Sequence, residues 1–170
     1  MTTVGIDDRT TGLIVAFLRD IRLRVETGSL VEPTFLPGVR IEHGGLIVDP
    51  LRLAYPGDLL HEAGHLAVVP PDQRAIMNGD AGDDQANEMM AMGWSYAATV
   101  HLGLDPGIVF HDGGYQGGAR TMLDSFASGR YLAVPMLQWI GLTFDERNAR
   151  DEGVPPYPYM VRWLRDATPV

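Results

Sequence analysis

No cysteine and no lysine occur among the 170 residues of the chain, and no apolar run is long. Without cysteine the chain can form neither a disulfide nor a thiolate metal site, so any metal ligand must be His, Asp, Glu or water. No stretch approaches the roughly 18 apolar residues of a membrane-spanning helix, and the N-terminus lacks a basic segment followed by an apolar one. We therefore expect a cytoplasmic protein with no membrane partner.

Basic residues are also scarce. The chain has 13 of them, all Arg, against 22 acidic residues, which gives a formal net charge of -9. Nucleic-acid binding relies on Lys and Arg side chains that neutralise phosphates. We therefore expect no nucleic-acid partner.

The composition is that of an ordinary globular protein, with 45% apolar and 21% charged residues. A chain of this length can bury one core, and it shows no internal repeat and no low-complexity tract. We expect a single domain that covers residues 1–170.

The first half of the chain is predicted to form a helix, a hairpin and a second helix. Apolar residues recur at three- and four-residue steps over residues 10–27, which is typical of an amphipathic helix. Runs of β-branched residues on both sides of a glycine turn predict a β-hairpin over residues 39–49. Proline can begin a helix at Pro56 and must end it at Pro70-Pro71, which predicts a helix of about three turns between them.

The second half is predicted to be mainly helical. A polar loop leads into a helix over residues 84–102, which Gly103 ends. Residues 105–118 are glycine-rich and predict a loop, and helical patterns return over residues 119–128, 132–142 and 159–166. The predicted fold class is α+β, with a small antiparallel sheet packed against the first three helices and a mainly helical C-terminal part.

Two histidines and a glutamate lie within the apolar stretch DLLHEAGHLAV, residues 58–68. On a helix the side chains of His61 and His65 project from one face and can bind one metal ion, with Glu62 beside its open side. A zinc ion (Zn²⁺) lowers the pKa of its bound water to near 7, and a carboxylate can take the proton as the water attacks a carbonyl. The pattern therefore predicts two zinc ligands, His61 and His65, and a general base, Glu62.

The alternative is a buried helix whose polar groups are satisfied without a metal. Two histidines and a carboxylate buried without partners would cost several kcal/mol, and one metal ion would satisfy all three. This favours the metal.

HEAGH with uncharged flanks resembles the signature of zincin metallopeptidases. The metzincin branch would have Gly and His where this chain has Val68 and Pro71. The gluzincin branch takes its third ligand, a glutamate, from a following helix, and Glu88 lies 23 residues after His65. Residues 88–97, EMMAMGWSYA, are similar to the third-ligand helix of small ImmA/IrrE-like peptidases. The resemblance covers about residues 39–100 and implies a minimal zincin-like domain with Glu88 as the third zinc ligand.

Other carboxylates near Glu88 are also candidates for the third ligand, namely Asp80, Asp83 and Asp84. Glu88 would in addition fit the first turn of a helix without any metal, because the helix dipole favours an acidic side chain there.

A hydrolase of this kind also needs a hydrogen-bond donor for the oxyanion that forms when water attacks the carbonyl. His111 and Tyr115, in the glycine-rich loop, are the candidates, with Asp112 to orient the donor. The alternative is a surface turn with an incidental histidine. Further candidates for the donor are Tyr96 and Arg120, whereas His43 and His101 are predicted to be structural.

Together these features predict a zinc-dependent metallopeptidase that acts on a peptide or protein substrate. The resemblance implies that a sheet edge beside the metal receives the substrate in extended form. The chain is too short for the second lobe of larger gluzincins, so substrate choice is expected to depend on an open groove, a partner or a homo-oligomer. Two alternatives stay open: a structural or regulatory zinc-binding domain without peptidase activity, and an interaction module with a coincidental HEAGH.

Overall fold

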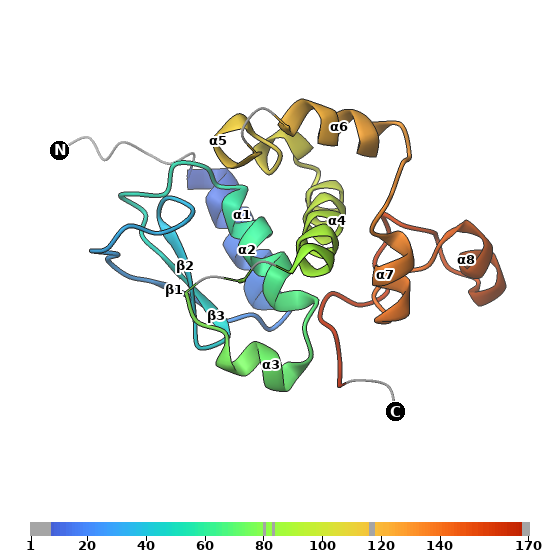
Figure 1. Cartoon of the computed structure of the whole chain (residues 1–170), viewed down its shortest axis with the longest axis horizontal. Coiled ribbons are helices and arrows are strands. Elements are labelled where there is room, and N and C mark those ends of the chain that lie inside the picture. Colours follow the sequence, from blue (N-terminus) through green and yellow to red (C-terminus); the bar gives the residue numbers. More distant parts are fainter. Residues whose placement is uncertain (1–7, 80, 83, 116–117, 168–170) are drawn as a thin grey trace.

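The computed structural model describes residues 8–79, 81–82, 84–115 and 118–167. These residues form the predicted α+β fold (Figure 1). A small sheet lies on one side of the molecule, helices α1, α2 and α4 lie in the middle, and the C-terminal helices lie on the other side. The candidate metal ligands belong to the central helices.

The sheet has the strand order β1-β3-β2. Strands β2 (Val39–Glu42) and β3 (Gly45–Val48) form the predicted antiparallel hairpin. Their turn residues, His43 and Gly44, have φ values of 46° and 74°, a pairing typical of tight hairpin turns. Strand β1 (Val25–Thr27) pairs in parallel with β3, so the sheet is mixed and β2 forms one of its edges.

Helix α1 (Asp8–Asp20) is shorter than predicted. The chain turns at Arg22, which has a φ of 75°, and residues 25–27 then enter the sheet as β1. The Arg19 guanidinium, in the last turn of α1, donates to the carbonyl of Val25 at 2.8 Å. The prediction of a helix to Thr27 was wrong because helix and strand bury apolar side chains in the same core, so the apolar pattern continues across the turn.

Helices α2 (Asp58–Ala67) and α4 (Gln85–Leu102) agree with the predicted helices over residues 56–70 and 84–102. The Asp84 side chain caps the start of α4 by accepting hydrogen bonds from backbone N–H groups, and Gly103 ends the helix in the left-handed conformation, with a φ of 68°. Every residue of α2 is buried, so the HEAGH segment lies in the core of the domain.

Gly64 allows α2 and α4 to pack closely. A Cβ atom at Gly64 would lie 2.8 Å from the carbonyl oxygen of Ala91 on α4. We expect Gly64→Ala to lower the free energy of unfolding by about 1–3 kcal/mol, because the helices must separate to fit the methyl group. Urea denaturation measures this change.

The matched control for this variant is Gly12→Ala in α1, where an added Cβ meets nothing within 4 Å. That substitution should be neutral or should stabilise the fold by about 0.5–1 kcal/mol, because Gly is a poor helix former. Equal effects at the two glycines would contradict the close packing.

Short helices complete the described part of the chain. Two of them, α6 (Ala119–Ala127) and α7 (Val134–Trp139), lie in segments predicted as helical. Residues 105–118, predicted as a loop, contain the helices η1 (Pro106–Ile108) and α5 (Asp112–Tyr115). Two helices were not predicted at all, α3 (Pro71–Ile76) and α8 (Glu146–Glu152).

Residues 159–166 do not form the predicted helix. Their backbone groups bond to distant parts of the chain instead: Val161 N–H donates to the Leu142 carbonyl at 3.0 Å, and Arg165 N–H donates to the Ala67 carbonyl at 2.8 Å. The Trp94 indole of α4 donates to the Trp163 carbonyl at 2.8 Å. These contacts anchor the C-terminal segment against the central helices and replace the local hydrogen bonds of a helix.

Candidate metal centre

The three predicted metal ligands meet between α2 and α4. His61 and His65 lie one turn apart on α2, and Glu88 lies in the first turn of α4. The Nε2 atoms of the two histidines are 3.2 Å apart. The Glu88 carboxylate oxygens lie 3.4 Å from Nε2 of His61 and 3.0 Å from Nε2 of His65. Ligand atoms about 2 Å from one tetrahedral zinc ion lie roughly 3.3 Å apart, so this spacing fits a single ion.

The cluster is buried on the α2 side and open on the α4 side. The side chains of His61 and His65 are 10% and 5% exposed, whereas that of Glu88 is 43% exposed. Burial, followed by the neighbouring charge of His65, lowers the pKa of His61 to about 4. His61 is therefore neutral at pH 7, the form in which imidazole binds a metal.

Nε2 of His65 lies 3.0 Å from a carboxylate oxygen of Glu88, which is within hydrogen-bond distance. Burial lowers the pKa of His65, but hydrogen bonds to Glu88 and Asn87 raise it more, so the pKa lies above its usual value. Burial raises the pKa of Glu88, but the two histidines lower it more, so this pKa lies below its usual value. A metal ion bound here would need Nε2 of His65 without a proton and would replace its direct contact with Glu88.

Asn87 holds His65 from the side opposite the cluster. Its Oδ1 atom lies 2.6 Å from Nδ1 of His65. An amide oxygen only accepts hydrogen bonds, so Nδ1 carries a proton and Nε2 is directed at the cluster. Sequence reasoning missed this buried residue, although its position next to Glu88 in the first turn of a helix was a usable signal.

We expect Asn87→Ala to weaken zinc binding by about 10- to 100-fold, because His65 loses the acceptor that orients its ring. Competition with a zinc-binding dye measures the affinity. Asn87→Asp keeps an acceptor oxygen and should retain most of it, and Gln85→Ala, at an exposed position in the same turn, should leave it unchanged. An unchanged affinity in Asn87→Ala would show that the hydrogen bond does not support the site.

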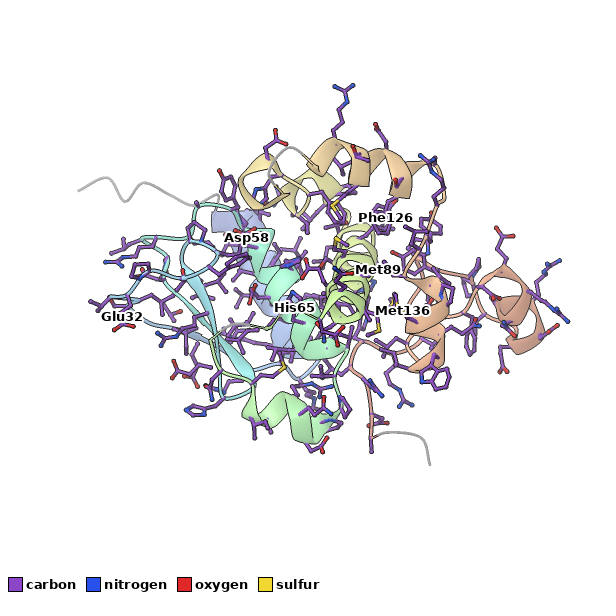
Figure 2. The ribbon with its side chains drawn as sticks, viewed as in Figure 1. Glu32, Asp58, His65, Met89, Phe126 and Met136 are labelled. Atoms are coloured by element: carbon purple, nitrogen blue, oxygen red, sulfur yellow. The ribbon has the colours of Figure 1, made fainter. Side chains whose placement is uncertain are left out.

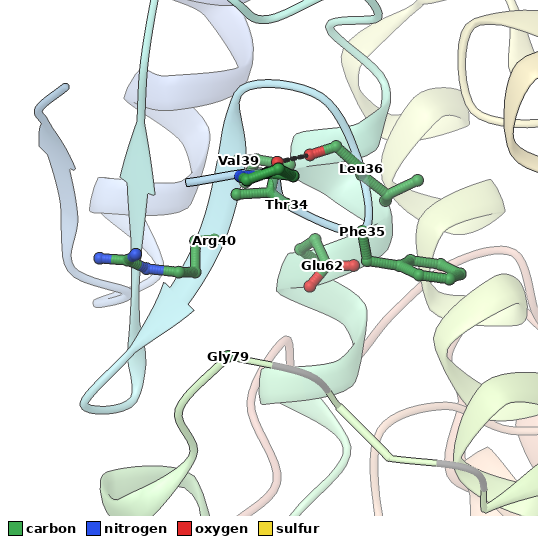
Figure 3. A pocket seen from close by; sticks show the side chains of 8 residues that line it. Thr34, Phe35, Leu36, Val39, Arg40, Glu62 and Gly79 are labelled. Atoms are coloured by element: carbon green, nitrogen blue, oxygen red, sulfur yellow. Dashed lines mark hydrogen bonds between the residues drawn. The ribbon is translucent and has the colours of Figure 1, made fainter. Parts of the chain in front are cut away.

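Glu62 lies on α2 next to His61 and is 8% exposed. Its charge raises the pKa of His65, which shows that it acts electrostatically on the cluster. Glu62 also lines a pocket of about 290 Å³ between α2 and the edge strand β2, together with Phe35 and Arg40 (Figure 3). The predicted general base therefore lines a pocket and also acts electrostatically on His65.

The outer edge of β2 is partly occupied by the chain itself. The Gly79 N–H group donates to the Ile41 carbonyl at 2.7 Å, in an antiparallel pairing. Val39 N–H donates to the Leu36 carbonyl at 3.4 Å. An extended peptide beside β2 would share this edge with the segment at Gly79, so the edge is less open than the resemblance implies.

His111 lies beside the N-terminal end of α2. Its Nε2 atom is 2.6 Å from Oδ1 of Asp58, and its ring stacks on Tyr55 with the ring centroids 3.9 Å apart. The charge of His111 contributes to the lowered pKa of His61, so the two rings interact electrostatically. Asp58, which Figure 2 labels on the same helix as His65, therefore orients His111. Asp112, which was predicted to orient the donor, is exposed on α5.

The Asp58 carboxylate is buried, with 2% of the residue exposed. Burial raises its pKa, and the hydrogen bond from His111 opposes this shift only in part. Gly57 explains why His111 can reach this position: a Cβ atom there would lie 1.9 Å from the Ile108 carbonyl oxygen. The segment before His111 therefore packs directly on the start of α2.

The rival third ligands do not join the cluster in the described part of the chain. Asp84 accepts hydrogen bonds from Ala86 N–H at 2.9 Å and Asn87 N–H at 3.3 Å, as the cap of α4. Asp80 and Asp83 lie outside the described residues. Among the described residues, the group that could hold a metal consists of His61, His65 and Glu88.

The other predicted oxyanion donors are placed less favourably. The side chain of Tyr115 lies outside the described residues. Tyr96 packs in an aromatic group, with its ring centroid 4.6 Å from that of Phe126, and Arg120 is exposed on α6. Two further histidines lie in structural settings, His43 in the hairpin turn and His101 against Phe17 and Trp163.

No known protein family, curated protein or solved structure matches this chain. The described residues also include no helix that is both long and apolar enough to cross a membrane. The function must therefore be argued from the site.

Proposed function

We propose that this chain is a zinc-dependent metallopeptidase, with zinc held by His61, His65 and Glu88 and with Glu62 as the general base. The observation that carries the proposal is the convergence of two imidazoles on α2 and a carboxylate on α4 at distances that fit one ion. The pattern HEAGH and the helix that bears Glu88 resemble zincins of the ImmA/IrrE-like kind.

The donor set supports zinc. Two imidazole nitrogens and one carboxylate oxygen are a common set for catalytic zinc, which keeps its fourth position for water. His61 is neutral, Asn87 orients His65, and the exposed side of Glu88 opens the cluster to solvent. When bound, the zinc would make the water acidic and polarise the substrate carbonyl.

Two side chains would then act on the reacting groups. Glu62 takes the proton of the attacking water and passes it to the leaving amine. His111 donates a hydrogen bond to the oxyanion through Nδ1, which is buried and has no hydrogen-bond partner among the described residues. Asp58 accepts a hydrogen bond from the opposite nitrogen, Nε2, and so holds the ring in place.

A zinc-binding domain without peptidase activity is the second candidate. The pairing of Gly79 with Ile41 favours it, because this pairing occupies part of the edge that an extended substrate would use. In that case the metal would hold α2 and α4 together.

The test is to load the purified protein with zinc, to measure the metal content, and to incubate the protein with a mixture of unstructured peptides analysed by mass spectrometry. We expect one zinc per chain and new peptide termini, which disappear with a chelator and return with zinc. Absence of stoichiometric zinc would contradict both candidates. Zinc without cleavage would support the second.

A further inference from the structure

We propose that Phe35 selects substrates that carry an apolar side chain next to the scissile bond. The inference rests on the proposed peptidase function, since it concerns the pocket that Phe35 shares with the general base Glu62.

The pocket has apolar walls beside a catalytic carboxylate. Leu36 and Val39 line it together with Phe35, and Glu62 lies at the same pocket (Figure 3). Its volume of about 290 Å³ is at the lower limit of ligand pockets, which suits one or two substrate side chains. A carbonyl attacked by water that Glu62 activates must lie close to Glu62, so the neighbouring side chain of the substrate would enter this pocket.

Phe35 is 84% exposed, so its ring presents apolar surface to solvent beside the pocket. An apolar side chain that covers this ring would remove apolar surface of both partners from water. A polar side chain in the same place would lose hydrogen bonds to water and gain no partner from the ring.

The loop that carries Phe35 is held in place. Asp49, which is 4% exposed, accepts a hydrogen bond from Leu30 N–H at 2.9 Å, and the Arg52 guanidinium donates to the Leu30 carbonyl. Thr34 donates to the Leu36 carbonyl at 2.5 Å. Substrate binding therefore need not order the loop first, which makes Phe35 an effective determinant of specificity.

The charges of the pocket do not favour an acidic substrate. The Arg40 guanidinium lies 2.5 Å from the Glu42 carboxylate and holds the pKa of that carboxyl below its usual value. The positive charge in the pocket is thus already compensated, while Glu62 would repel a second carboxylate. Apolar side chains are the class that the lining favours.

The experiment uses zinc-loaded protein and four peptides of glycine and serine that differ at one central residue, Leu, Phe, Ser or Asp. We expect kcat/KM for cleavage next to Leu or Phe to exceed that for Ser or Asp by at least about tenfold. Phe35→Ala should bring the ratio close to one, mainly by slowing cleavage of the Leu and Phe peptides. An unchanged ratio in Phe35→Ala, or a wild-type preference for Ser or Asp, would overturn the inference.

Leu51→Ala is the matched control, because Leu51 is 87% exposed on a neighbouring turn but does not line the pocket. It should leave the ratio unchanged. Circular dichroism checks that both variants fold.

A separate measurement distinguishes failure of this inference from failure of the proposed function. Fluorescence anisotropy gives the Kd of labelled Leu and Ser peptides for zinc-loaded Glu62→Gln protein, whether or not any peptide is cleaved. Binding of the Leu peptide about tenfold more tightly, lost when Phe35→Ala is added, would support the pocket even if the wild type cleaves nothing. Equal binding of the two peptides would reject it.

Discussion

Glu62→Gln is expected to keep one zinc per chain and to lower kcat for peptide hydrolysis by about 10²- to 10⁴-fold. Glutamine has nearly the shape of glutamate but cannot take a proton from water. The three proposed ligands, His61, His65 and Glu88, are not altered, so zinc affinity should change little. Metal analysis and the peptide cleavage assay measure the two properties on the same preparation.

The control for this variant is Glu146→Gln, which removes a charge at an exposed position on α8. It should change neither zinc content nor kcat. If Glu62→Gln retains both its zinc and full activity, Glu62 is not the general base.

Glu88→Ala is expected to weaken zinc binding by at least about 100-fold, more than the loss of an orienting residue such as Asn87. The weaker binding also reduces the stability that zinc confers on the folded state. Zinc at 1,000 times the wild-type Kd stabilises the folded state by about 4.1 kcal/mol, and a 100-fold weaker site reduces this to about 1.4 kcal/mol. Urea denaturation of each protein with and without zinc measures this gain in stability. Because each protein is compared with itself, the gain does not depend on the contact with His65 that Glu88→Ala also removes.

Asp84→Ala tests the rival ligand in the same assay. It removes the cap of α4 and should lower stability by about 1 kcal/mol both with and without zinc. The increase in its free energy of unfolding when zinc is added should equal that of the wild type. If Asp84→Ala loses the stability gained from zinc and Glu88→Ala keeps it, the third ligand is Asp84 and not Glu88.

Asp58 stands three residues before His61 on α2. Its buried carboxylate accepts the hydrogen bond of His111, so the start of this helix also contributes to the proposed site.

Local signals in the sequence were enough to place the helices that carry the site. The spacing of His61 and His65 puts both on one helix face, and the caps Asp84 and Gly103 mark the ends of α4. These signals act within one or two turns of a helix, so they can be read without knowledge of the rest of the chain. The hairpin over residues 39–49 was predicted for the same reason, since its turn glycine, Gly44, lies between its strands.

Two segments with a helical apolar pattern do not form helices, because their backbone groups pair with other parts of the chain. Residues 25–27 continue the apolar pattern of α1 but become a strand because β3 offers a partner. Residues 159–166 have helical periodicity, yet their backbone groups bond to Leu142 and Ala67. Periodicity reports which side chains are buried, and it does not report which backbone groups will pair.

The composition of the site was decided by tertiary structure. Glu88 reaches the histidines because Gly64 lets α4 pack close to α2, Asn87 is directed at His65 by the same contact, and His111 meets Asp58 across the chain. Each of these pairs joins residues more than 20 positions apart, at distances that only the packing of α2 against its neighbours sets. The local sequence pattern therefore predicted the two histidines and their helix, whereas the packing of the core determined which residues contact them.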